Sequence, residues 1–101
     1  MSAESPAVHG FIASGFDAVG AAFERAFEGA PGMGAALAIR MSGETVVDLW
    51  GGIADARVAS PWVSETSTVV FSCTKGVMSL LAARLAEDGL LDYDAPVAQY
   101  W

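Results

Sequence analysis

Residues 14–28 place four large apolar side chains at helical spacing, and a cluster of helix-breaking residues follows them directly. The four are Phe16, Val19, Phe23 and Phe27. This period predicts an amphipathic helix with one apolar face. Ser14 stands where an N-cap is expected, and Asp17 occupies the capping-box position three residues later. The segment GAPGMG at 29–34 ends the helix, and a strand should follow it.

Two apolar runs at 35–40 and 45–50 are typical of a β-hairpin. The second run reads TVVDLW, whose β-branched and aromatic residues favour strands, and Gly43 between the runs suits a tight reversal. The glycine pair at 51–52 is expected to end the second strand, where the backbone bends or approaches another segment closely. Residues 54–68 then form a loop longer than usual, which favours a functional or docking role.

A second helix is predicted over 73–88, after a brief extended segment at 68–71. Gly89 lies just beyond its end, as helix stops often do. Apolar residues cover most of its circumference, a pattern typical of a helix in the middle of a larger body. A third, shorter helix is expected with Asp94 as its cap. The inner side of that helix would carry Val97, Tyr100 and Trp101.

Composition excludes several classes of protein. The chain has 101 residues, 53% of them hydrophobic and 17% charged, which indicates one domain and excludes disorder. The net charge of −7 would repel phosphate backbones and anionic lipids, so neither nucleic acid nor a membrane is expected as a partner. Cys73 is the only cysteine, residues 1–8 lack a basic signal-peptide start, and no apolar run reaches about 18 residues. A soluble cytoplasmic protein is expected.

Ser72 and Lys75 form the constellation that favours catalysis. Positions three apart share a helix face, so the lysine can fold back toward the serine hydroxyl. A serine hydroxyl is a weak nucleophile that needs a base, and a lysine in an apolar site gives up its proton readily. The N–H groups at the start of the helix can face the oxyanion formed from an ester or amide carbonyl. The same residues also fit an ordinary N-cap serine and a first-turn lysine whose stem lies along apolar surface.

The remaining candidate residues favour structural roles. Cys73 is expected to be a small buried hydrophobe. His9, in an irregular N-terminal segment, has no second ligand at metal-binding spacing, so no metal is expected. The aspartates Asp88, Asp92 and Asp94 fit solvated capping better than calcium binding. No residue pattern predicts a cofactor, since the Gly-x-Gly at 32–34 follows a helix where a dinucleotide site needs a strand.

Three segments in order resemble serine β-lactamase-related hydrolases. They are FSCTKG at 71–76, DLWGGIAD at 48–55 and LAEDGLLDYDAPVAQYW at 85–101. The resemblance covers about residues 10–101 and is closest to the N-terminal part of family VIII carboxylesterases, which resemble class C β-lactamases and penicillin-binding proteins. It implies an α+β fold of the β-lactamase and transpeptidase type. Residues 1 to about 56 would belong to the sheet layer, and about 66–101 would begin the helical region that carries the nucleophile helix.

The resemblance also implies an activity and its residues. Ser72 resembles the acyl-accepting nucleophile of the family, and Lys75 its proton-transferring partner. The family's catalytic tyrosine and third motif do not match Tyr93 or Tyr100, so the remaining C-terminal polypeptide of the same enzyme is expected to supply them. The activity expected is hydrolysis of short-chain carboxylic esters through an acyl-enzyme. Hydrolysis of β-lactams or of D-Ala-D-Ala peptides, and a non-catalytic binding module of the same fold, are the alternatives.

Overall fold

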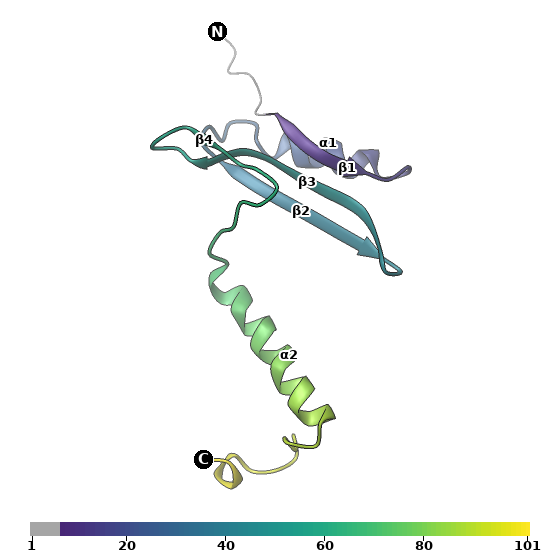
Figure 1. The fold of residues 1–101 in the computed structure, drawn as a ribbon, viewed down its shortest axis with the longest axis vertical. Helices are drawn as coiled ribbons and strands as arrows, with labels where there is room; N and C mark the ends of the chain where they lie inside the picture. The colour runs from purple at the N-terminus through teal and green to yellow at the C-terminus, as the bar shows by residue number, and fades with distance from the viewer. Residues whose placement is uncertain (1–6) are drawn as a thin grey trace. The chain divides into compact units, whose positions relative to one another are not determined.

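The computed structural model describes residues 7–101, which divide into two compact units. The sheet unit ends at Ser67, and the helical unit runs from Thr68 to Trp101. Figure 1 shows the strands and the helix α1 of the first unit and the helix α2 of the second. The strands of the first unit are antiparallel, and the longer helix follows them in the second unit, which confirms the expected α+β class.

The sheet unit is built around one long central strand. The strands are β1 (Val8–Ile12), β2 (Gly34–Met41), β3 (Glu44–Asp55) and β4 (Ser60–Pro61). β1 and β2 pair with the two edges of β3 in the order β1-β3-β2, and β4 pairs with the far end of β3. All of these pairings are antiparallel. Every other strand of the unit therefore depends on β3.

The predicted hairpin is confirmed as β2 and β3, but its second strand runs further than expected. Ser42 and Gly43 in the turn have φ values of 51° and 81°, and two positive values in succession are the signature of a type I′ hairpin turn. β3 does not end at its glycine pair and continues to Asp55. A Cβ on Gly52 would lie 2.1 Å from the Met33 carbonyl oxygen, so the expected close approach of backbones is real.

Strand β1 is an element that sequence reasoning did not predict. His9 lies within it and not in an irregular segment, and its ring centroid is 6.5 Å from that of Trp50 on the neighbouring strand. The expected loop at 54–68 also contains a strand, the two-residue β4. Both strands are short, and β1 pairs with residues distant in sequence, so local periodicity does not reveal them.

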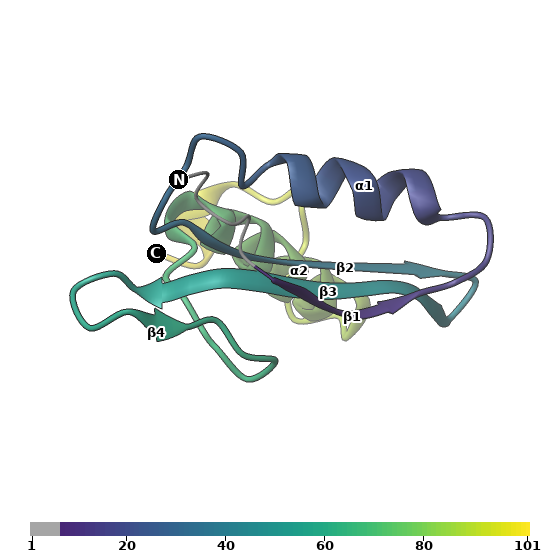
Figure 2. The same cartoon turned by 90° about the horizontal axis from the view of Figure 1, so that it is seen from above.

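Helix α1 (Asp17–Arg25) lies along one face of the sheet, as Figure 2 shows. Phe23 and Phe27 are buried with their rings in an edge-to-face arrangement, 5.3 Å between centroids. They pack with Val47 and Leu49 of β3 to form the core, so the predicted apolar face is confirmed. The predicted cap is wrong: the N-cap residue is Phe16, and no side chain caps this helix end.

The helical unit consists of α2 (Thr74–Glu87) flanked by two short 3₁₀ turns, Phe71–Cys73 and Val97–Gln99. The predicted second helix is confirmed to within a residue at each end. Residues 68–71 form no strand, in contrast to the extended segment expected there. The expected third helix is a single 3₁₀ turn whose N-cap is Pro96, so Asp94 does not cap it.

Candidate active site

The chain enters α2 through a tight turn that contains Ser72. The Cys73 N–H donates to the Val70 carbonyl oxygen at 3.1 Å, and Phe71 and Ser72 lie between them. Phe71 has a φ of 45°, a conformation unusual for a bulky residue. Regular α-helix begins at Thr74 with Cys73 as its N-cap, so Ser72 lies two residues before the helix, close to the start that the sequence predicted.

The structure brings the two predicted catalytic side chains together. Lys75 Nζ donates a hydrogen bond to Ser72 Oγ at 3.2 Å. Lys75 lies in the first turn of α2, and its carbonyl oxygen accepts a hydrogen bond of 3.0 Å from Ser79 Oγ. The spacing of three residues places both groups on one side of the helix start, where a proton can pass directly between hydroxyl and amine.

The electrostatics at this helix start favour a developing negative charge. The first turn of α2 carries no acidic side chain. The Ser72 N–H donates to no backbone carbonyl within residues 7–101, whereas the next N–H, that of Cys73, is used by the turn. Lys75 takes part in neither ion pair of the described chain, which are Arg57–Asp55 and Arg84–Asp88. One N–H without a backbone acceptor and the Lys75 amine therefore stand beside the serine hydroxyl.

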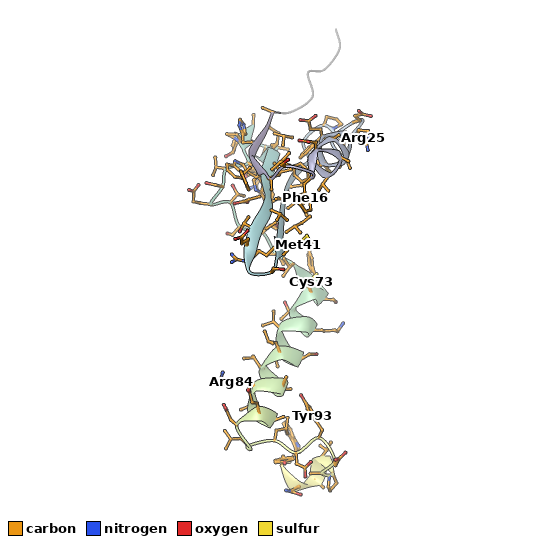
Figure 3. All side chains as sticks on the ribbon, turned by 90° about the vertical axis from the view of Figure 1, so that its right-hand side faces the viewer. Phe16, Arg25, Met41, Cys73, Arg84 and Tyr93 are labelled. Atoms are coloured by element: carbon orange, nitrogen blue, oxygen red, sulfur yellow. The ribbon has the colours of Figure 1, made fainter. Side chains whose placement is uncertain are left out.

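Cys73 differs from expectation. It is a free thiol and exposed, not a buried hydrophobe, and the other residues of the 3₁₀ turn are exposed as well. Figure 3 shows Cys73 at the start of α2 and Arg84 toward its other end, with side chains projecting around the whole helix. Its position next to Ser72 places the thiol on a different side of the turn from the Lys75 contact, since adjacent helical residues do not share a face.

The acidic residues after α2 make local hydrogen bonds. Arg84 Nε donates to Asp88 Oδ2 at 3.2 Å, and the Asp94 N–H donates to Asp92 Oδ1 at 2.9 Å. The Asp92 N–H in turn donates to the Tyr100 hydroxyl oxygen at 2.9 Å. Tyr100 thus holds the C-terminal turn in place, which fits the structural role expected of it.

No metal site or membrane-spanning helix is found in the part of the chain that is described. Residues 7–101 hold no group of three or more His, Cys, Asp or Glu side chains placed to bind a metal ion. None of the described helices is long and apolar enough to cross a membrane.

The clear pKa shifts occur in the sheet unit. Hydrogen bonds from the Arg57 side chain and backbone lower the pKa of Asp55. A hydrogen bond from the Ser64 side chain lowers the pKa of Glu65.

Two shallow hollows in the helical unit are lined mostly by apolar side chains. The first is bordered by Leu80, Leu81, Ala83, Arg84 and Glu87. The second is bordered by Leu91, Asp92, Tyr93, Ala95, Val97, Tyr100 and Trp101. Neither is lined by Ser72 or Lys75.

The left-handed conformation of Phe71 is the feature of the site that sequence reasoning missed. An aromatic residue gives no signal for positive φ, which is normally read from Gly, Asn or Asp. The Ser-x-x-Lys spacing predicted only that the two side chains share one side of the helix start. The backbone that presents them became visible only in the structure.

Comparison with known proteins yields three matches. The beta-lactamase family profile matches residues 23–101. A protein of Mycobacterium tuberculosis named esterase/beta-lactamase LipL is 45% identical over 86 residues, which is 85% of this chain and 20% of that protein. A crystal structure of a family VIII carboxylesterase shares 42% sequence identity with a TM-score of 0.88, and the match covers 94% of this chain and 26% of that one.

The chain therefore spans about a fifth to a quarter of the length of these relatives. The identity and the TM-score together confirm the fold expected from the sequence resemblance, a β-lactamase-like arrangement of antiparallel sheet and helices. They also confirm the resemblance itself, down to the carboxylesterase group named for the structural neighbour.

Proposed function

We propose, because this chain belongs to the beta-lactamase family, that it forms part of a serine hydrolase acting on short-chain carboxylic esters through an acyl-enzyme. The observation that carries the proposal is the 3.2 Å hydrogen bond between Lys75 Nζ and Ser72 Oγ at the start of α2. The names of the two relatives, an esterase/beta-lactamase and a carboxylesterase, support the choice of esters.

The geometry accommodates each proton transfer of such a reaction. Ser72 Oγ attacks the ester carbonyl carbon while its proton passes to the Lys75 amine, which acts as the general base. The oxyanion that forms accepts a hydrogen bond from the Ser72 N–H. Collapse of the tetrahedral intermediate expels the alkoxide, which takes the proton from Lys75 and leaves as the alcohol. Water then attacks the acyl-serine, and the carboxylic acid departs as Ser72 regains its proton.

The 101 residues supply one part of this machinery. An oxyanion hole generally uses a second donor besides the N–H of the nucleophile. We assign that donor, and the second proton-transfer group, to the remaining C-terminal polypeptide of the same enzyme. Residues 1 to about 56 would then serve as the sheet layer and about 66–101 as the start of the helical region. We also place the enzyme in the cytoplasm, which fits a 101-residue part that has one cysteine and so no disulfide of its own.

Labelling with a fluorophosphonate tests the assignment of Ser72. The full-length wild-type protein should be labelled at one serine, and Ser72→Ala should abolish the labelling. Lys75→Ala should slow acylation by about 10²- to 10⁴-fold, the usual contribution of a general base, and change substrate binding far less. Cys73→Ser is the matched control and should keep most of the activity. Labelling that survives Ser72→Ala and disappears with Cys73→Ser would identify the thiol as the nucleophile.

The name of the relative in Mycobacterium tuberculosis favours one second candidate, hydrolysis of β-lactams. A β-lactam is a cyclic amide, and the same serine would open it by the same acyl transfer. Rates with nitrocefin and with p-nitrophenyl butyrate distinguish the two. Higher kcat/KM for the ester supports the carboxylesterase assignment, and higher kcat/KM for nitrocefin reverses it. A wild-type protein that takes no fluorophosphonate label at all is a non-catalytic module.

A further inference from the structure

Ser79 lies on the same side of α2 as the proposed catalytic pair. It follows Lys75 by four residues and Ser72 by seven, and both spacings return to one side of a helix. Its hydroxyl is one of two in α2, and the other belongs to Thr74. Ser79 Oγ donates a hydrogen bond of 3.0 Å to the Lys75 carbonyl oxygen. The hydroxyl therefore contacts the backbone of the residue whose amine contacts Ser72.

The backbone of Lys75 lies at a weak part of the helix. The 3₁₀ turn Phe71–Cys73 precedes α2, and Lys75 is the second residue of the helix. Gly76 follows, and glycine disfavours a helix because it loses the most backbone freedom on folding. A Cβ on Gly76 would meet no atom within 4 Å, so no contact within residues 7–101 requires glycine there. The helix therefore restrains the peptide between Lys75 and Gly76 less than it would restrain a peptide between two alanines.

The Ser79 hydroxyl adds a restraint to this peptide. In an α-helix the carbonyl of Lys75 accepts the N–H of the residue four positions later, which is Ser79. The hydroxyl of Ser79 gives the same oxygen a second hydrogen bond. Serine often bonds the carbonyl four residues earlier, and elsewhere in a helix the result is only a slight bend. Here the oxygen belongs to Lys75, and the orientation of that peptide determines where the lysine side chain starts.

We infer that Ser79 is a positioning residue: its hydroxyl holds the Lys75 backbone so that the lysine amine stays at Ser72 Oγ. This inference rests on the proposed serine hydrolase function. Two hydrogen bonds follow one another along the helix, from Ser79 Oγ to the Lys75 carbonyl and from Lys75 Nζ to Ser72 Oγ. A general base must lie within hydrogen-bond distance of the proton that it takes, and a displacement of about 1 Å can slow a reaction about 100-fold.

The pre-steady-state acylation of the full-length enzyme by p-nitrophenyl butyrate measures the role of Ser79. Ser79→Ala removes the hydroxyl, and one hydrogen bond of this kind shifts an equilibrium by about three- to tenfold. We expect the acylation rate to fall by about that factor, with the dissociation constant of the substrate unchanged. Ser79→Thr keeps a hydroxyl that can bond the same carbonyl, so its rate should stay within about twofold of wild type.

Two further substitutions separate positioning from helix stability. Gly76→Ala strengthens the same turn without adding a hydroxyl, so it should restore most of the acylation rate when combined with Ser79→Ala. Ala83→Gly is the matched control, because it weakens α2 about two turns beyond Lys75. It should lower the stability of the enzyme and leave the acylation rate unchanged.

A double-mutant cycle with Lys75 tests whether Ser79 acts through the lysine. In a Lys75→Ala background no amine remains to be positioned, so Ser79→Ala should not slow acylation further. The rate of fluorophosphonate labelling at Ser72 measures this effect in variants whose ester turnover is too slow to follow.

The outcomes are distinguishable from failure of the proposed function. A wild-type enzyme without fluorophosphonate label at Ser72 overturns that function. With Ser72 labelled, a folded Ser79→Ala with the wild-type acylation rate overturns the role of Ser79. Equal losses in the alanine and threonine variants, or an undiminished loss from Ser79→Ala in the Lys75→Ala background, overturn it as well. If Ser79→Ala does not fold, a slowed acylation in the folded Ser79→Thr is the contradicting result.

Discussion

The two units of this chain differ in how much of their apolar side-chain surface is buried. The sheet unit contains every buried hydrophobic residue of the described chain: Phe23, Phe27, Val47 and Leu49. The helical unit contains none, and thirteen of the seventeen exposed large hydrophobic residues belong to it. Both units are rich in apolar side chains, but only the first pairs a helix with a sheet that covers its apolar face.

The buried core and the proposed catalytic side chains therefore lie in different units. The core residues lie in the sheet unit, while Ser72 and Lys75 lie in the unit without a core. A helix with apolar residues on all sides is stable in water only when other segments surround it. The proposed catalytic pair is therefore borne by the unit that depends most on further polypeptide.

The largest expected effect concerns residues 1–101 produced alone. The exposed apolar surface of the helical unit should make this chain aggregate or bind a hydrophobic dye strongly, and it should not hydrolyse p-nitrophenyl butyrate above background. Co-expression with the remainder of the enzyme should restore both solubility and turnover. Dye fluorescence and ester hydrolysis are the measurements. A soluble, cooperatively folding and active monomer of 101 residues would remove the contrast between the units.

Truncation of one leucine in each unit tests the contrast directly. Leu49 is 3% exposed and should lose about 2–5 kcal/mol of unfolding free energy on substitution by alanine, through lost burial and a cavity. Leu81 is 54% exposed, so Leu81→Ala should change stability by no more than about 0.5 kcal/mol. Urea titration of dilute residues 1–101, followed by tryptophan fluorescence, measures both. Equal costs would show that the helical unit has a core of its own.

Replacing a glycine in α2 by alanine should have a smaller effect, and it should stabilise the helix instead of destabilising it. A Cβ added at Gly76 meets no atom within 4 Å, and the residue lies inside the helix. Gly76→Ala should stabilise α2 by roughly 0.5–1 kcal/mol in a peptide of residues 68–101, seen as increased helicity by circular dichroism. The matched variant Gly89→Ala, at a φ of 75° beyond the helix end, should lower helicity. Unchanged helicity in Gly76→Ala would contradict the open surface described here.

The smallest expected effect is a pH dependence in the sheet unit. Arg57 Nη2 lies 2.7 Å from Asp55 Oδ2, and hydrogen bonds from Arg57 lower the pKa of Asp55 in the folded chain. The unfolded chain thus binds a proton at Asp55 more readily than the folded one. The pair stabilises above the unfolded value of about 3.9, and this contribution disappears as pH falls through the lowered pKa.

Arg57→Ala should therefore lower stability slightly at pH 7 and leave it unchanged near pH 2. Because both side chains lie at the surface, solvent screens the pair and the change should be small. Thermal unfolding of wild type and variant at the two pH values is the measurement. A difference in melting temperature that is larger at low pH than at pH 7 would contradict this assignment.

Sequence reasoning succeeded where structure is local. The helical spacing of Phe16 to Phe27 identified the buried face of α1, the glycine at 43 located the hairpin turn, and the Ser72–Lys75 spacing located the two side chains that meet. Each of these signals comes from residues within a few positions of one another. Their physical cause is the fixed period of the helix and the φ requirement of a tight turn.

Sequence patterns did not predict a strand whose partner is distant in sequence, nor a residue with a strained backbone. β1 was missed because a five-residue strand with a glycine at its centre becomes a strand only through hydrogen bonds to β3. The caps were misplaced because no side chain caps α1 or the turn at 97–99. The conformation of Phe71 opposes the preference of its residue type, so only context can impose it.

The central position of β3 has a consequence for the order in which the sheet assembles. β2 and β3 meet across a two-residue turn, which closes fast and at little entropic cost. In contrast, Ile12 of β1 pairs with Val47, thirty-five residues further along the chain, and that closure is slow. During synthesis β1 leaves the ribosome before β2 and β3, so it stays unpaired until all of β3 has been made. We therefore expect the β2–β3 hairpin to form first and β1 to dock on it afterwards.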